Sequence, residues 1–379
     1  MESLLSPLTG LYQPNNLNSM YYGSGSVKAN LINCLPSGSS KAFIITGSSL
    51  ANKTPLVKQV EELLGSKHHA GTFSKIGQHA PINDLDEATK QVKNDPSIDT
   101  IISIGGGSPI DSAKAISYRV YETSDKFLHH IAIPTTLSAA ECSFVAGYTK
   151  EDGLKVAVAH PNLFPSVIIY DSAFGLYTPS HLWLSTGMRA LDHAVELQYH
   201  PTASEVPCRS SCAVAVRDLF TYLPKAKEDP QNEDTITRLY LAAFNSLSFL
   251  GKNVKGSLGL SHTFGYALGS PYQIPHGVTS CLTLGHVVKA KTAQSEENAK
   301  RCADLLPMIG GSRTGNNVKD GNAVGDAIID LVQRLGLKTT LTEYGVGKDQ
   351  VDIICQRATG GQKEGEQYEA VKKIVLTLY

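Results

Sequence analysis

The sequence predicts a two-domain protein, with an α/β domain over residues 1–176 and an all-helical domain over residues 177–379. A chain of 379 residues, 41% of them hydrophobic, can bury two separate cores. Strand and helix patterns alternate as far as about residue 171, and after that point apolar residues recur mainly at helical spacing. The first domain is therefore expected to contain a Rossmann-like parallel sheet, and the second to consist of packed helices.

The α/β domain is predicted from short apolar runs that alternate with amphipathic ones. Predicted strands cover residues 41–47, 70–77, 100–105, 128–136 and 164–171, with a hairpin over 147–160. Predicted helices cover residues 54–65, 82–94 and 109–118. Because helices separate most successive strands, a parallel sheet with crossover helices is the economical arrangement.

The helical domain is predicted from apolar residues that recur every three to four positions, with glycine or proline between several of the runs. The predicted helices cover residues 178–200, 211–223, 234–251, 260–269, 277–292, 295–306, 322–336 and 368–379. The polar stretch 310–322 predicts a surface loop.

The amino-acid composition limits the kinds of molecule that the protein is expected to bind. The chain carries 34 Lys and Arg residues against 35 Asp and Glu, so no overall field would hold nucleic acid or an anionic membrane, and a small-molecule substrate is expected. No apolar run approaches the roughly 20 residues that span a bilayer, and the N-terminal stretch lacks the pattern of a secretion signal. The seven cysteines form no CxxC pair, which favours a reducing compartment and thus the cytoplasm.

A glycine-rich segment connects the predicted strand 100–105 to a helix with Pro109 in its first turn. Glycines let the backbone turn tightly and approach phosphate oxygens, and free N–H groups at a helix start attract negative charge. A plain strand-to-helix turn is the alternative. The residues predicted to bind the phosphates of a nucleotide are Gly105, Gly106, Gly107 and Ser108.

The predicted strand 41–47 is followed by small polar residues. In dinucleotide sites an acidic residue near this position accepts a hydrogen bond from the ribose 2′-hydroxyl and repels a 2′-phosphate. The segment 46–49 contains no acid, which favours NADP over NAD. Gly47 and Ser48 are accordingly predicted to contact the coenzyme.

Further coenzyme contacts are predicted in the helix after the glycine-rich segment and in the turn at the end of strand 128–136. Asp111 and Lys114 follow the glycine-rich segment; they are either nucleotide contacts, or a helix cap and a solvated lysine. We include Asp111 among the coenzyme-binding residues. In the turn around the end of strand 128–136, Thr136 and Ser138 are predicted to line the nicotinamide pocket, and Thr135 is predicted to bind the coenzyme.

Three histidines, His193, His262 and His276, lie in stretches otherwise built from small, apolar or glycine residues. They are expected near helix starts that face the α/β domain. A single histidine in such surroundings is usually a hydrogen-bonded core residue, so the residues alone do not assign them a role.

Four motifs, in this order, resemble those of the iron-containing alcohol dehydrogenase family, which has a dehydroquinate synthase-like fold. They are GGGSPIDSAKAI at 105–116, IPTTLSAAECS at 133–143, GMRALDHAVE at 187–196 and SHTFGYALGSPYQIPHG at 261–277. The resemblance is close over about residues 20–290. It implies an NAD(P)-dependent oxidoreductase, and we also expect a homodimer.

The resemblance further implies a metal bound by one Asp and three His, but the Asp position holds Arg189. The histidine positions fall on His193, His262 and His276. A guanidinium four residues before His193 opposes a divalent ion. Asp192 is expected to point about 100° away from His193 on the helix, so that it could not replace the missing ligand. We therefore expect no catalytic metal.

A second departure is Tyr266, where metal-dependent members carry another histidine. Its hydroxyl is either a proton donor, or its ring packs under the coenzyme. The element IGQHAPI around His79 and the lost acidic ligand resemble the maleylacetate reductase branch, which works without a metal. That branch has a neutral residue in place of Arg189, so maleylacetate need not be the substrate.

Together these residues predict a metal-independent, NAD(P)H-dependent reductase, maleylacetate reductase-like, acting on a carbonyl or enone between the domains. Arg189 would bind the oxyanion or a substrate carboxylate. His262, His276 or Tyr266 would donate the proton, and His193 would orient it. The alternatives are an Fe- or Zn-dependent alcohol dehydrogenase with the three histidines as ligands, and a non-redox isomerase or lyase of the same fold.

Overall fold

The computed structural model describes residues 11–153 and 155–379. The prediction about a secretion signal falls partly on residues 1–10, which lie outside this part. Among the described residues no helix has the length and apolar character needed to cross a membrane.

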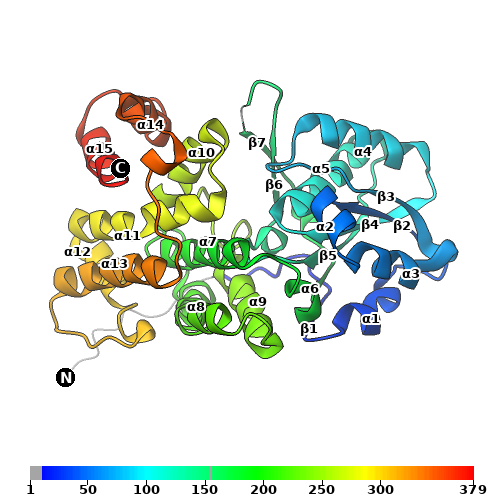
Figure 1. Ribbon diagram of the computed structural model, residues 1–379, viewed down its shortest axis with the longest axis horizontal. Helices are drawn as coiled ribbons and strands as arrows, with labels where there is room; N and C mark the ends of the chain where they lie inside the picture. Colours follow the sequence, from blue (N-terminus) through cyan, green and yellow to red (C-terminus); the bar gives the residue numbers. More distant parts are fainter. Residues whose placement is uncertain (1–10, 154) are drawn as a thin grey trace.

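A six-stranded parallel sheet forms the centre of the α/β domain (Figure 1). Its strands are β1 (Ser19–Tyr22), β2 (Lys41–Thr46), β3 (His69–Phe73), β4 (Ile98–Gly105), β5 (His129–Pro134) and β8 (Val167–Tyr170). They pair in the order β1-β8-β5-β4-β2-β3. Ile101 on β4 belongs to one hydrophobic core and Ile102 to another, as expected for a sheet covered on both faces.

Helices cover the two faces of this sheet. They are α1 (Ser26–Asn30), α2 (Ser48–Lys53), α3 (Leu56–His68), α4 (Ile82–Asn94), α5 (Gly107–Ser124) and α6 (Ser172–Gly175). Residues of α1 and α3 fill the core on one face, and residues of α4 and α5 fill the core on the other. An antiparallel hairpin, β6 (Val145–Thr149) and β7 (Lys155–Ala159), extends toward α10 of the helical domain (Figure 1).

The helical domain is built around α7 (Ser180–Gln198). Its other helices are α8 (Ser210–Glu228), α9 (Glu233–Leu247), α10 (Leu260–Tyr272), α11 (His276–Gln294), α12 (Glu296–Ala303), α13 (Asn317–Arg334), α14 (Val351–Ala358) and α15 (Glu366–Thr377). Residues 183–198 of α7 are all buried, because α8, α9 and α11 pack around the helix. A fully buried helix is normally apolar, yet α7 carries Arg189, Asp192, His193 and Glu196.

This architecture confirms the predicted fold class, a parallel-sheet domain followed by a helical one. The sheet ends at Tyr170 and α7 begins at Ser180, on either side of the predicted boundary. The predicted loop 310–322 is wrong in its second half, because Asn316 caps a helix by accepting a hydrogen bond from the N–H of Lys319. Strand β1 and helices α1, α2, α6 and α14 were not predicted.

Candidate active site

The glycine-rich segment lies where the chain direction across the sheet reverses. From β2 the chain continues outward to β3, whereas from β4 it continues to β5 on the other side. Thr46 and Ile104 are register partners, so Gly47 and Ser48 leave the sheet beside residues 105–108. A crevice at the carboxyl ends of strands at such a reversal is the usual ligand-binding position of an open α/β sheet.

The backbone in this crevice is tightly packed and tolerates little beyond glycine. Gly105 has a φ of 139°, in the region that favours glycine. A Cβ on Gly106 would lie 3.1 Å from Cγ2 and Oγ1 of Thr136. Within residues 11–153 and 155–379, no side chain caps the start of α5. The 18-residue helix α5 therefore presents its first N–H groups to the crevice, an arrangement that fits the pyrophosphate of a dinucleotide.

The segment after β5 joins the sheet to the helical domain. The N–H of Thr135 donates to the carbonyl of Gly105 over 2.9 Å, and the hydroxyls of Thr136 and Ser138 lie 3.1 Å apart. The N–H of Leu137 donates to the hydroxyl of Thr186 on α7. The predicted nicotinamide-pocket residues thus lie between the glycine-rich segment and α7.

Asp111 and Lys114 both face the hairpin. Lys114 is fully buried and donates to the carbonyls of Ala140 and Val145 over 2.6 and 2.9 Å, so the interpretation as a solvated lysine was wrong. The carboxylate of Asp111 accepts from the N–H of Gly147 and lies 3.6 Å from the Lys114 ammonium. These bonds fix the hairpin to α5, and a nucleotide contact by Asp111 stays a prediction.

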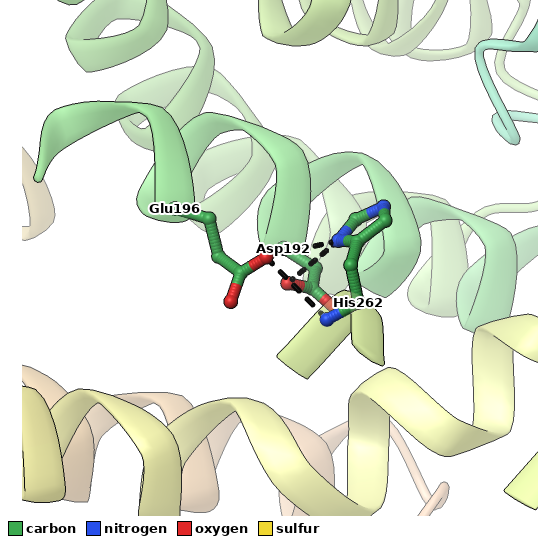
Figure 2. A group of neighbouring side chains, drawn as sticks. All are labelled: Asp192, Glu196 and His262. Atoms are coloured by element: carbon green, nitrogen blue, oxygen red, sulfur yellow. Dashed lines mark hydrogen bonds and ion pairs between the residues drawn. The ribbon is translucent and has the colours of Figure 1, made fainter. Parts of the chain in front are cut away.

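A group of ionisable side chains lies inside the helical domain, where α7 and α10 meet. Figure 2 shows Asp192 and Glu196, one turn apart on α7, together with His262 of α10. Nδ1 of His262 lies 3.1 Å from Oε2 of Glu196 and 3.4 Å from Oδ1 of Asp192. Burial, and then the charge of Asp192, raise the pKa of Glu196. The pKa of Asp192 is lowered: burial alone would raise it, but His262 and Arg189 outweigh that effect.

Asp192 therefore faces the site, and the expectation that it points away from it was wrong. Its Oδ2 accepts hydrogen bonds from the hydroxyls of Ser280 and Ser261 over 2.5 and 2.8 Å. It also lies 3.4 Å from Nη1 of Arg189, a residue three positions earlier on the same helix. The i, i+3 spacing brings Asp192 and Arg189 to one face of α7, and that spacing was visible in the sequence.

The Arg189 guanidinium is buried and lies among the predicted catalytic residues. It donates to the hydroxyl of Ser280 over 3.3 Å. A Cβ on Gly265 of α10 would lie 3.1 Å from its Nη1, so the glycine leaves room for the guanidinium. Its positive charge contributes to lowering the pKa values of His193 and His276, after burial in each case.

The three histidines do not form one group of metal-ligand type, because the only such group among the described residues consists of Asp192, Glu196 and His262. His193 lies within α7 rather than near a helix start, contrary to prediction, whereas His262 and His276 lie in the first turns of α10 and α11. The rings of His193 and His262 lie 4.7 Å apart. His276 instead has its Nε2 2.7 Å from Nζ of Lys155 on the hairpin.

Other groups surround His276. The ring of His79 lies 5.0 Å from the His276 ring, and burial, followed by the charge of Lys155, lowers the pKa of His79 to about 4. The ring of Tyr266 lies 6.2 Å away and is 55% exposed. Tyr266 can therefore reach a bound ligand, and its two predicted roles, proton donor and packing residue, both stay predictions.

Besides Asp192, two residues at this site were not predicted. Glu196 was part of the quoted GMRALDHAVE motif and lies four residues after Asp192, so its position on the same helix face could have been recognised. Lys155 carried no comparable signal, because a lysine in a hairpin strand is ordinarily solvated.

These residues do not fit the metal centre that the resemblance implies. His276 is engaged by a lysine, and His262 by two carboxylates. Ligand-type atoms of Asp192, Glu196 and His262 do lie within 4.8 Å of one another. Asp192, however, already accepts hydrogen bonds from two hydroxyls and neighbours a guanidinium, which opposes a divalent cation.

Comparison with known proteins gives the family. The profile described as "Iron-containing alcohol dehydrogenase" matches residues 18–172, and "Fe-containing alcohol dehydrogenase family, C-terminal" matches residues 183–379. The chain belongs to the iron-containing alcohol dehydrogenase family. The resemblance found in the sequence is thereby confirmed, and the protein is an NAD(P)-dependent oxidoreductase of this family.

Relatives within the family differ in chemistry. A maleylacetate reductase from Rhizobium sp. (strain MTP-10005) is 29% identical over 76% of this chain and 75% of its own. An NADPH-dependent butanol dehydrogenase from Clostridium saccharobutylicum is 27% identical over 93% of both chains. The fold also matches a crystal structure of 1,3-propanediol oxidoreductase, with a TM-score of 0.86, 21% identity, and coverage of 97% of this chain and 100% of the other. These relatives give no support to a non-redox isomerase or lyase.

Proposed function

We propose that this member of the family is a metal-independent, NAD(P)H-dependent reductase of a carbonyl or enone, similar to maleylacetate reductases. The observation that carries the proposal is the buried guanidinium of Arg189. It stands at the helix position where the resemblance implies an aspartate ligand, and it is paired with Asp192 and Ser280. A fixed cation in this position can perform the electrostatic task of a metal ion.

When bound, the reduced coenzyme would supply a hydride to a carbonyl carbon; the carbonyl oxygen would then take up the electron pair and a proton. Arg189 would bind this oxygen as its negative charge develops, because NH groups of a guanidinium form strong charge-assisted hydrogen bonds. His276 is an unsuitable acid, since burial and neighbouring charges hold its pKa well below the usual range. His262 and Tyr266 are the proposed proton donors, and His193, whose ring lies 4.7 Å from that of His262, would orient it.

A metal-dependent alcohol dehydrogenase is the second candidate. One observation favours it: Asp192, Glu196 and His262 place a carboxylate pair and an imidazole close enough to share an ion. Binding there would require Arg189 to move away from Asp192. Metal dependence therefore separates the two candidates.

We expect the purified enzyme to contain no stoichiometric Fe or Zn and to keep its activity after dialysis against a chelator. The measurements are elemental analysis and the oxidation of NAD(P)H, followed by its absorbance, with a panel of ketones, aldehydes and enones. A metal-dependent family member treated in parallel controls for effective chelation. Activity that is lost on chelation and returns with added metal would establish the alcohol dehydrogenase candidate instead.

We propose NADP(H) as the preferred coenzyme, because the segment 46–49 beside the crevice holds no acidic residue. Ser48 is exposed at the start of α2. Ser48→Asp is expected to lower the ratio of kcat/KM for NADPH over NADH by about tenfold, through repulsion of the 2′-phosphate. Ser39→Asp, at an exposed turn before β2, is the matched control. An unchanged ratio in Ser48→Asp would show that the ribose lies elsewhere.

We further propose a small-molecule substrate, no nucleic-acid or membrane partner, a homodimer and a cytoplasmic location. Size-exclusion chromatography with light scattering tests the dimer directly.

A further inference from the structure

Lys155 reaches from the hairpin of the α/β domain to the helical domain. Its Nζ lies 2.7 Å from Nε2 of His276 and 5.6 Å from the centre of the Tyr266 ring. His276 is neutral, because burial and the charges of Lys155 and Arg189 hold its pKa well below the usual range. The ammonium is therefore the hydrogen-bond donor and the imidazole nitrogen is the acceptor.

The Lys155 ammonium can donate further hydrogen bonds besides the one to His276. An ammonium has three N–H groups, of which His276 takes one. In the described part of the chain no ion pair joins Nζ to a carboxylate, although Asp111 lies close enough to stabilise the charge. The charged or titratable groups that face Lys155 from the elements around it are Asp111 of α5, Arg189 of α7, Tyr266 of α10 and His276 of α11, with His79 beside His276.

Holding a charged ammonium in this partly buried position costs free energy. Burial disfavours the charged ammonium and lowers the pKa of Lys155 to about 8, and the Arg189 charge adds to that effect. Arg189 and Lys155 are thus two cations on opposite sides of the domain boundary, with the neutral ring of His276 influenced by both. Both cations carry N–H groups for which the described residues provide no acceptor, and such groups favour the binding of negatively charged oxygen.

A cavity lies on the far side of His79 from His276, and Lys155 and His276 are not among its lining residues. This cavity of about 280 Å³ lies between the loop before α4, the turn of the hairpin and the end of α10, and His79, Thr149 and Ser270 are among its lining residues. The His79 ring, which lines the cavity, also lies against His276. Two buried polar atoms beside the cavity, Nε2 of His79 and Oγ of Ser270, have no hydrogen-bond partner among the described residues.

We propose that Lys155 is a catalytic residue of this enzyme: held by Nε2 of His276, its ammonium binds the substrate's carbonyl oxygen opposite Arg189 and stabilises the oxyanion. The proposal rests on the proposed reductase function. It makes His276 a positioning residue that acts through Lys155. The hairpin then supplies one half of the oxyanion site and α7 supplies the other.

The test compares Lys155→Met with Lys155→Arg in the full-length enzyme, using whichever carbonyl compound the wild type reduces. Lys155→Met is expected to lower kcat by roughly a hundredfold while the Kd for NADPH, from fluorescence titration, stays within about twofold. Lys155→Arg keeps the cation and is expected to retain activity within about tenfold of wild type. Lys155→Gln serves in place of Lys155→Met if the methionine variant unfolds at a lower temperature.

A double-mutant cycle tests the role of His276. His276→Leu removes the acceptor that holds Lys155, so adding it to Lys155→Met is expected to cause little further loss. Lys126→Met, which alters an exposed lysine just beyond the end of α5, is the matched control and should behave like wild type.

Two results would overturn the proposal: full kcat in both Lys155→Met and Lys155→Gln, or a loss of NADPH affinity large enough to account for the loss of activity, which would make Lys155 a coenzyme ligand. A different result is expected if the proposed reductase function itself is wrong. In that case the wild type oxidises no NAD(P)H with any carbonyl compound, or its activity depends on a metal.

Discussion

Replacing Arg189 by alanine is expected to lower kcat/KM by roughly a hundredfold without loss of coenzyme binding. The guanidinium supplies a charge-assisted contact to the oxyanion in a buried site, and losing such a contact costs on the order of 2 to 4 kcal/mol in the transition state. Steady-state kinetics gives kcat and KM separately, and fluorescence titration gives the NADPH affinity. A fall in both kcat and kcat/KM would place the interaction in the transition state.

Two further variants at position 189 test which property of the arginine the reaction needs. Arg189→Lys keeps the charge but loses the planar fork, so intermediate activity is expected. Arg189→Asp places a carboxylate four residues before His193, on the same face of α7, and it should give the protein affinity for Zn²⁺ or Fe²⁺ that the parent lacks. Calorimetric titration with Zn²⁺ measures this gain.

Arg238→Ala, which removes an exposed ion pair on α9, controls for the general effect of deleting an arginine. Thermal unfolding of each variant is needed as well, because removing Arg189 leaves the buried carboxylate of Asp192 without the neighbouring guanidinium. Unchanged turnover in a folded Arg189→Ala protein would refute the role of the guanidinium in catalysis.

Gly106→Val is expected to abolish measurable NAD(P)H binding while the helical domain stays folded. A Cβ at this position already lies 3.1 Å from the Thr136 side chain, and the two methyl groups of valine extend further into the crevice at the start of α5. The backbone must then shift away from the position in which its N–H groups can reach a phosphate. Fluorescence titration with NADPH measures binding, and far-ultraviolet circular dichroism measures helix content.

The matched control is Gly38→Val, at a turn where an added Cβ meets no atom within 4 Å. It should bind NADPH as the wild type does. Wild-type affinity in Gly106→Val would mean that the dinucleotide phosphates bind at another part of the sheet.

The fold could be predicted because its elements carry strong local patterns. The helix over residues 82–94 was predicted to the residue, since Leu85, Ala88 and Val92 mark one buried face. Strand β1 has four residues at the sheet edge and no such pattern. Helix α14 did carry helical spacing in its buried residues, so its signal was available and was missed.

The sequence pointed to some residues of the candidate site, but it did not indicate how their side chains pair. Motifs identified Arg189 and the histidines, and neighbours on one helix, such as Asp192 and Glu196, follow from helical spacing alone. The contact between Lys155 and His276 joins residues 121 positions apart on different domains. No local pattern encodes such a contact, because it depends on how the hairpin is placed against α11.

The burial of Lys114 limits which amino-acid substitutions this sequence can accept during evolution. Its ammonium is fully enclosed, and its charge is balanced by Asp111 and, at longer range, by Glu141. A mutation that neutralises Asp111 alone would leave a buried cation poorly compensated and would also free the N–H of Gly147 in the hairpin. Single substitutions at either residue are therefore expected to be eliminated by selection. Descendants of this sequence should keep Asp111 and Lys114 together or exchange them together, even where the substrate has changed.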